Sequence, residues 1–335
     1  MVVSRQLAFV IGCALLASCG GGDSSSPPAT GGGGTPTPSP SPTPSPSPTP
    51  TYQTFNQLTG TQNFNAICSG TRDRGFLGGG LLPELASSFG ENIRITSDRT
   101  GPDYTITTNP NLSVGQSFQL AFNQADRDPT PNTERYSRVS STGFTNRFVV
   151  STPLGNGAPY EYARFGQIIT RNDLGDTFTL GCAYGVPTLL TDVPTATVAY
   201  RNTVIFGTMA LIEMDGNGPR SNYVMTPSVL TLSANPTTGR VTFNLDLKGR
   251  LVTGSTVSTE DTSFGQFQSE LTADDNDGRF RGNLEIPGGI TPGNTAGGFF
   301  GPRGREAAFS FSMLTRDSQN RRLVVAGVAF LTPQT

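Results

Sequence analysis

The second half of the chain alternates hydrophobic and polar residues with a period of two. Between positions 241 and 248, Val, Phe, Leu and Leu are separated by Thr, Asn and Asp, a pattern typical of a strand with one apolar face. This alternation and intervening turn residues predict strands at 197–214, 229–234, 239–248, 262–273, 278–286, 297–300, 306–315 and 323–331. About eight antiparallel strands with an apolar inner face can close into a barrel filled by side chains.

From residue 52 to about residue 190 the chain is less regular and rich in Asn, Thr, Gly and Pro. Short β-branched or alternating runs predict strands at 93–96, 104–107, 117–122, 146–151, 160–171 and 178–180. Residues 126–133 are expected to form a loop. Residues 81–89 are expected to form a short helix, with Pro83 in its first turn and Gly90 after it. The expected fold is therefore all-β, with an irregular β-rich domain (52–190) followed by an eight-stranded antiparallel β-barrel with a filled interior (191–335).

The N-terminus has the pattern of an export signal. Arg5 supplies a positive charge, and ten mostly apolar residues, 7–16, lead through small residues to Cys19. This run is too short for a membrane-spanning helix, which needs about 20 residues. The segment LASC at 16–19 resembles the lipobox of bacterial lipoproteins. The resemblance implies a signal peptide at 1–18 and a Cys19 that carries palmitate-type acyl chains, and multiple chains give a stable anchor. The alternative is an ordinary signal peptide with a chance cysteine.

A linker rich in Gly, Ser, Thr and Pro follows Cys19 and extends to residue 51. Proline at every second position favours extended polyproline II over the 17 residues 35–51, which would reach roughly 50 Å. Such a linker can hold a folded body away from a membrane; a ligand for SH3-like domains is the alternative. In lipoproteins of the kind that the lipobox resembles, Asp after the cysteine favours the inner membrane. Gly20 stands there instead, which implies the outer membrane.

Composition excludes several classes of function. The formal net charge is −2 and no basic run occurs, so nucleic acid is not an expected partner. The chain has no histidine, which excludes Ser-His-Asp and Cys-His catalysis and histidine-ligated zinc, copper or haem. No cofactor is expected, and a metal site would need oxygen ligands. The absence of tryptophan also disfavours a membrane-spanning barrel, which usually has aromatic girdles.

The predicted folded body contains two cysteines, Cys68 and Cys182. Disulfides persist in the compartments that exported proteins reach, so one bridge between these residues is expected. It would close a long loop and stabilise the fold by up to about 4–5 kcal/mol in the chain-entropy model. Two unpaired buried thiols are the alternative.

One segment resembles a known family. GFFGPRGREAAF at 298–309 is similar to a block in the C-terminal barrels of transferrin-binding protein B-like surface lipoproteins. YGVPT at 184–188 and DVPT at 192–195 resemble the junction between handle and barrel in bacterial relatives, and YARFGQ at 162–167 resembles the strand before it. The resemblance implies one handle domain and one barrel, where the transferrin binders have two such lobes. Phe300 replaces the more usual tyrosine, and Ala307-Ala308 replace glycines.

The residues of this block have expected structural roles. Gly301-Pro302 should end one strand and turn the chain, and Glu306 should open the next strand. Phe299 or Phe300 can plug one end of the barrel. Glu306 is expected to accept hydrogen bonds from loop amides, and a catalytic role for it is not favoured.

Other candidate sites have simpler structural explanations. Residues 274–278 (DDNDG) suggest a calcium loop, but Ala273 and Leu284 would occupy ligand positions of an EF-hand, so a hairpin turn is favoured. Glu260-Asp261 and the acidic residues at 274–277 could supply paired carboxylates for a glycosidase. Four tyrosines could ligate ferric iron but on strands usually pack as half-buried residues, namely Tyr104, Tyr136, Tyr160 and Tyr162. Glycines 78–80 form a loop without the Lys-Ser/Thr of a phosphate cradle.

The resemblance implies a non-enzymatic outer-membrane surface lipoprotein that binds a protein or an iron-bearing ligand. A TonB-dependent outer-membrane receptor is a further implied partner. The handle loops are the expected contact surface because loops on a rigid scaffold vary most freely, and no individual binding residue is assigned. Two alternatives remain: a periplasm-facing structural or assembly lipoprotein, and a carboxylate-based hydrolase.

Overall fold

The computed structural model describes residues 51–74, 80–87, 89–101, 103–108, 118–129, 134–213, 218–226, 228–236, 238–273, 279–287, 292–317 and 319–334. They belong to one compact unit, Thr49–Thr335. Cys19, the predicted signal peptide and all of the linker before Thr51 lie outside the described residues. The regular elements in the described part are antiparallel strands and short 3-10 helices, which confirms the all-β prediction. None of the helices described is long and apolar enough to cross a membrane.

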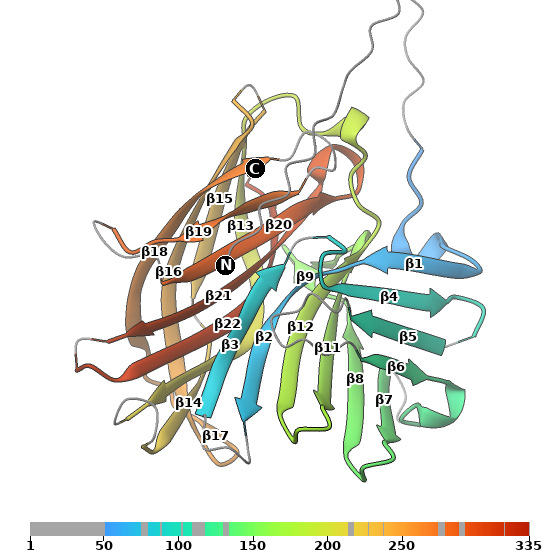
Figure 1. The fold of residues 1–335 in the computed structure, drawn as a ribbon. Coiled ribbons are helices and arrows are strands. Elements are labelled where there is room, and N and C mark those ends of the chain that lie inside the picture. Colours follow the sequence, from blue (N-terminus) through green and yellow to red (C-terminus); the bar gives the residue numbers. More distant parts are fainter. Residues whose placement is uncertain are drawn as a thin grey trace, which may run out of the picture. The chain divides into compact units, whose positions relative to one another are not determined.

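Eight described strands of the second half close into an antiparallel barrel (Figure 1, yellow to red). They pair in the order β13-β15-β16-β18-β19-β20-β21-β22, and β22 pairs with β13 to complete the ring. The short strand β14 pairs with both β13 and β16, and β17 pairs with β16. The bounds are β13 Val198–Ile212, β14 Arg220–Val224, β15 Val229–Asn235, β16 Arg240–Thr253, β17 Thr256–Val257, β18 Thr262–Ala273, β19 Phe280–Leu284, β20 Gly293–Phe300, β21 Glu306–Arg316 and β22 Arg322–Pro333.

Alternating side chains fill the interior of this barrel. On β16, Val241, Phe243, Leu245 and Leu247 are buried, while residues 242 and 244 face solvent. The four buried side chains join a single core cluster that takes residues from every strand of the ring. The period of two in the sequence therefore places an apolar side chain inside the barrel at every second position.

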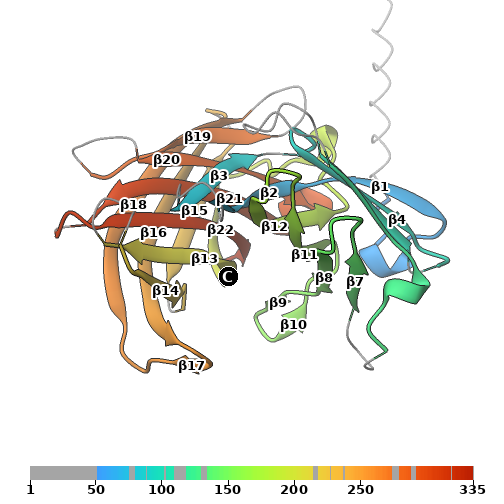
Figure 2. The ribbon, with the colours of Figure 1, turned by 60° about the horizontal axis from the view of Figure 1, so that its bottom comes forward.

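The first half, residues 52–190, forms two large sheets and a small hairpin in its described part, and we call it the handle (Figures 1 and 2, blue to green). The six-stranded sheet has the order β3-β2-β12-β11-β8-β7, and the four-stranded sheet has the order β1-β4-β5-β6. Residues of both sheets form a second buried core, which includes Phe64, Ile95, Tyr104 and Phe148.

The handle strands are β1 Thr61–Asn65, β2 Ile67–Arg74, β3 Gly80–Ser87, β4 Ile93–Asp98, β5 Asp103–Thr108, β6 Gln119–Phe122, β7 Glu134–Val139, β8 Thr145–Ser151, β9 Leu154–Gly155, β10 Ala158–Pro159, β11 Ala163–Arg171 and β12 Thr177–Gly185. The strands β9 and β10 pair with each other as a small hairpin. Short 3-10 helices are η1 Phe55–Gln57, η2 Gln124–Asp126, η3 Leu190–Asp192 and η5 Pro302–Gly304.

The helix predicted at residues 81–89 is wrong, because residues 81–87 belong to the strand β3 and Phe89 lies in a turn. This strand pairs antiparallel with β2 and lies at the edge of the six-stranded sheet, where Pro83 is tolerated. Leu81 is buried in a small cluster with Ala210, Ile212 and Val324 of the barrel. Pairing with β2 and burial against the barrel override the helix signals in the local sequence.

The outer face of the barrel is covered where β2 and β3 lie against β20, β21 and β22 (Figure 1). Phe309 and Phe311 point into the barrel, while the alternating Ser310 is fully buried under the handle. Its hydroxyl donates to the carbonyl oxygen of Ser87, 3.1 Å away. In return, the hydroxyl of Ser69 donates to the carbonyl oxygen of Phe311 at 2.7 Å. These small polar side chains satisfy backbone groups in a tight contact between two sheets.

Glu306 makes the most concentrated polar contact between barrel and handle. Its two carboxylate oxygens accept hydrogen bonds from the backbone N–H groups of Glu161, Tyr162 and Ala163, at 2.6 to 3.3 Å. The sequence led us to expect such bonds, and the structure shows that the amides lie just before and at the start of β11. Burial raises the pKa of the Glu306 carboxyl to about 7, although the three N–H donors act in the opposite direction.

Cys68 and Cys182 form a disulfide bond within the handle. They face each other on the paired strands β2 and β12, and both are buried in the handle core. The bond closes a loop with a sequence separation of 114 residues, so it joins the beginning of the handle to its end.

We expect the variant with both Cys68→Ala and Cys182→Ala to lose about 2–5 kcal/mol of the free energy of unfolding, because the unfolded chain regains the freedom of a long loop. Chemical denaturation of the wild-type and variant proteins measures this difference. Fully reduced wild-type protein should unfold like the variant. Equal stability of oxidised and reduced wild-type protein would contradict the prediction.

The raised pKa of Glu306 predicts a pH dependence of stability. The folded-state pKa of about 7 exceeds the reference value of 4.5. The contribution of the protonated Glu306 carboxyl to the free energy of unfolding is therefore fully present below pH 4.5 and is lost as the pH rises through 7. The shift corresponds to about 3 kcal/mol. Denaturation curves between pH 4.5 and pH 8 should show this loss in the wild-type protein and not in Glu306→Gln.

The exposed Glu260 provides a matched control for this experiment, since it lies in a turn of the barrel. Glu260→Gln should keep the pH profile of the wild-type protein. A Glu306→Gln profile parallel to the wild type would show that this carboxyl does not set the dependence.

Candidate functional site

The residues that the sequence singled out in the barrel lie in the turn between β20 and β21 and at the adjoining ends of these strands. Gly301 has a φ of 69°, a conformation that favours glycine, and Pro302 begins η5. Phe299 packs in the barrel core, whereas Phe300 lies on the opposite face against Phe89 of the handle, with ring centroids 5.1 Å apart. Phe299 therefore fills the barrel beside the turn and Phe300 helps to hold the handle, so both have packing roles here.

The four tyrosines considered as iron ligands do not meet. Tyr104 and Tyr136 pack against each other in the handle core, with ring centroids 5.3 Å apart. Tyr160 and Tyr162 lie in a different cluster, between handle and barrel. Burial raises the pKa of Tyr104, Tyr136 and Tyr160, which disfavours the phenolate that ferric iron would need. No group of three His, Cys, Asp or Glu residues suited to a metal occurs in the part of the chain that the structure describes.

The acidic candidates do not form a catalytic pair in the described residues. Asp261 is bound to Arg250, with 2.7 Å between its Oδ1 and Nε, at the surface of the barrel. Residues 274–278, and with them the candidate calcium loop, lie outside the described residues, as do glycines 78 and 79.

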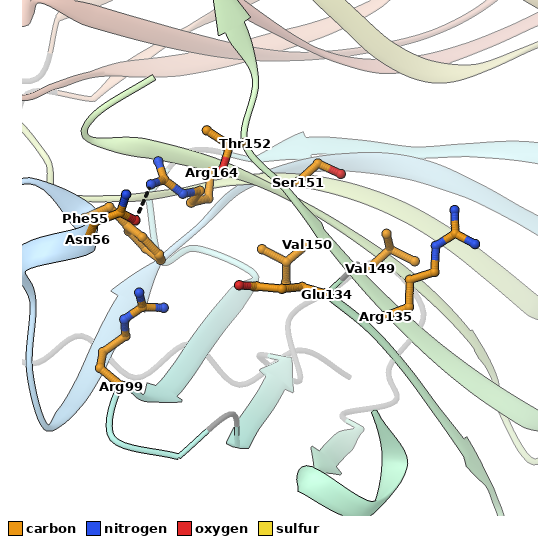
Figure 3. Close-up of a pocket in the computed structure, with 10 residues that line it drawn as sticks. All are labelled: Phe55, Asn56, Arg99, Glu134, Arg135, Val149, Val150, Ser151, Thr152 and Arg164. Carbon is orange, nitrogen blue, oxygen red and sulfur yellow. Dashed lines mark hydrogen bonds between the residues drawn. The ribbon is translucent and has the colours of Figure 1, made fainter. Parts of the chain in front are cut away.

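A pocket of about 420 Å³ opens on the handle (Figure 3). It lies among η1, the end of β4, and the strands β7, β8 and β11, which come from both handle sheets. We call it the handle pocket. Its lining residues are Phe55, Asn56, Arg99, Glu134, Arg135, Val149, Val150, Ser151, Thr152 and Arg164.

Two guanidinium groups lie over the ring of Phe55 in this pocket. The Cζ atoms of Arg99 and Arg164 are 4.5 and 4.4 Å from the ring centroid, within the range of a cation–π interaction. Figure 3 shows Arg164 and Arg99 on opposite sides of Phe55. The aromatic ring thus positions two positive charges at one wall of the pocket.

Arg164 is held by neutral oxygen atoms. Its side chain is 4% exposed. Its guanidinium donates to the carbonyl oxygens of Tyr160 and Ala163, at 2.9 and 2.8 Å, and to Oδ1 of Asn56 at 2.7 Å. Burial lowers the pKa of Arg164, and the neighbouring Arg99 acts in the same direction. The group nevertheless remains a cation at neutral pH, as arginine does in proteins.

Glu134 supplies a carboxylate to the same pocket. The hydroxyl of Tyr104 donates to its Oε2 at 3.3 Å. In Figure 3 the carboxylate of Glu134 points toward the side on which Phe55, Arg99 and Arg164 lie, whereas Arg135 points away from them. The pocket therefore contains two positively charged guanidinium groups and one carboxylate that can accept hydrogen bonds from a ligand.

No pattern in the sequence indicates this pocket. Its charged residues are spread from Arg99 to Arg164 with no motif spacing, and Phe55 lies close to the linker. Only the folding of η1 across β11, with an N–H···O bond of 2.8 Å from Phe55 to Glu161, brings them together.

Comparisons with known proteins give matches among solved structures. No family model and no curated protein matches the chain. A double mutant of transferrin-binding protein B from Haemophilus parasuis Hp5 matches 80% of this chain and 45% of its own length, with 12% identity and a TM-score of 0.39. The N-lobe of lactoferrin-binding protein B from Moraxella bovis matches 83% of this chain and 100% of its own length, with 13% identity and a TM-score of 0.32.

HpuA from Kingella denitrificans, solved in complex with human haemoglobin, matches 83% of this chain and 89% of its own length, with 16% identity and a TM-score of 0.31. The chain thus spans less than half the length of the transferrin-binding protein B structure that it matches. Transferrin-binding protein B is also the type of protein that the segment at 298–309 resembles. Since all three TM-scores are below 0.5, the fold assignment rests on the strand pairings described above.

Proposed function

We propose that this protein is a non-enzymatic surface lipoprotein of the bacterial outer membrane that binds a protein or an iron-carrying ligand through its handle. Cys19 carries the lipid anchor, and residues 20–51 form the spacer. The barrel (191–335) is the scaffold, and the handle (52–190) presents the binding surface. A TonB-dependent receptor that takes over the ligand is a further partner in this proposal.

The observation that carries the proposal is the handle pocket. It is a hollow lined by charged side chains, on a part of the molecule that a disulfide and a buried contact hold in place. Pockets with a few well-placed polar groups on a rigid scaffold are typical of binding sites. Exposed apolar residues also occur on the handle, including Val139 at 65% and Leu174 at 60% exposure, and these suit contact with a protein partner.

The hydrolase alternative finds little support in the described residues. A carboxylate mechanism needs two acidic groups facing one cleft, and the lining of the handle pocket includes one, Glu134. The Glu306 carboxylate is engaged by backbone N–H groups. The periplasm-facing alternative differs only in the leaflet and side on which the anchored body lies, so it requires a cellular experiment.

Protease treatment of intact cells tests the location. The expected result is cleavage in the Thr/Pro/Ser linker and loss of the cell-bound signal from an antibody against the barrel. A known surface protein must be cleaved in the same cells, and a periplasmic protein must remain intact. Protection until the outer membrane is permeabilised would contradict surface exposure and favour the periplasmic alternative.

Substitution of the predicted lipidation site tests the anchor. Cys19→Ser should abolish labelling by radioactive palmitate and move the protein from the membrane fraction to the soluble fraction, because the sulfur that takes the lipid is gone. Cys13→Ser, within the predicted apolar run of the signal peptide, is the matched control and should be labelled normally. Undiminished labelling of Cys19→Ser would contradict the predicted site.

A further inference from the structure

The handle pocket holds two arginines without a carboxylate partner. Among the residues that the structure describes, neither Arg99 nor Arg164 forms an ion pair. Arg164 is hydrogen-bonded only to neutral oxygens. The Nε atom of Arg99 is buried and has no hydrogen-bond partner in the described residues. A buried N–H donor without a partner, beside two cations that form no salt bridge in the described residues, is unusual because such groups are normally paired.

The cation–π contacts explain the positions of the two guanidiniums without neutralising them. Phe55 attracts each guanidinium through the negative face of its ring. It cannot accept the N–H bonds that a guanidinium offers in its plane, and these suit the two oxygens of a carboxylate or phosphate. The contact with Phe55 therefore leaves donors of Arg99 available to a ligand.

The remaining lining restricts the ligand further. The pocket volume of about 420 Å³ exceeds what a single inorganic ion needs. Ser151 and Thr152 add hydroxyl groups at the wall. Glu134 adds a carboxylate, which would repel a bare anion but accept a hydrogen bond from a hydroxyl or ammonium group.

We propose that the handle pocket binds a small organic oxyanion, a carboxylate or a phosphate ester that also carries a hydroxyl or ammonium group. The anionic group binds the free N–H donors of Arg99, the buried Arg164 adds positive charge behind Phe55, and the hydroxyl or ammonium group donates to Glu134. This inference rests on the proposed function, since it specifies the ligand chemistry of the same handle. The oxyanion is either a free small molecule or the recognised part of a larger ligand.

Isothermal titration calorimetry with the full chain in detergent tests the proposal. Citrate is the carboxylate probe, glycerol 3-phosphate is the phosphate-ester probe, and glycerol is the neutral control. At least one of the two anionic probes should bind, with an affinity that falls as salt rises, while glycerol should not. Binding of citrate alone identifies a carboxylate site, and binding of glycerol 3-phosphate alone identifies a phosphate site.

Arg99→Gln is the informative variant, because the Arg99 side chain makes no hydrogen bond in the described residues and its loss should leave the fold intact. The probe that binds the wild-type protein should bind this variant about tenfold more weakly or worse. Arg99→Lys keeps the charge but not the planar fork and should have an intermediate affinity. Arg240→Gln, on the barrel surface, is the matched control and should bind like the wild type.

Circular dichroism spectra must first show that each variant is folded. Absence of binding by both anionic probes, or equal affinity of Arg99→Gln and the wild type, overturns the proposal. These results do not affect the proposed location at the cell surface, which protease treatment tests separately. The proposed oxyanion site is supported by a probe that binds the wild-type and Arg240→Gln proteins equally and binds Arg99→Gln weakly.

Discussion

The arrangement of handle and barrel depends on the carboxylate of Glu306. Three consecutive backbone N–H groups, from Glu161 to Ala163, donate to this one side chain at the point where the handle strand β11 begins. Amides just before a strand have no ladder partner, and leaving them buried without an acceptor would be costly. Glu306, the first residue of the barrel strand β21, accepts these hydrogen bonds. The start of β21 thereby holds the start of the handle strand β11 in place.

The surrounding contact has a composition suited to close packing of sheet against barrel. Ser310 and Ala308 on the outer face of β21 are small and fully buried, and Phe300 reaches the ring of Phe89. A larger side chain at the alanine position would separate the two surfaces. The disulfide between Cys68 and Cys182 links neighbouring strands within the handle, and so keeps the sheet that lies on the barrel intact.

The contact between handle and barrel also bears on the handle pocket. The elements that line it come from both handle sheets, and one of them, β11, begins at the amides that Glu306 holds. Arg164 lies on that strand, one residue after the last of these amides. The barrel therefore helps to set the position of a charged group in the pocket.

The sequence alone determined the all-β fold and most strands of the barrel ring, because the period of two along segments such as 241–248 directly records which side of a strand is apolar. It also indicated the turn at 301–302 and the hydrogen-bonding role of Glu306. It did not indicate the short strands β14 and β17, which pair with β13 and β16. Tertiary structure decided the rest. Residues 81–87 became part of a strand because β2 and the barrel offered partners that local propensity cannot include. The handle pocket was decided only by folding, since Phe55, Arg99, Glu134 and Arg164 share no local pattern and meet where two sheets converge.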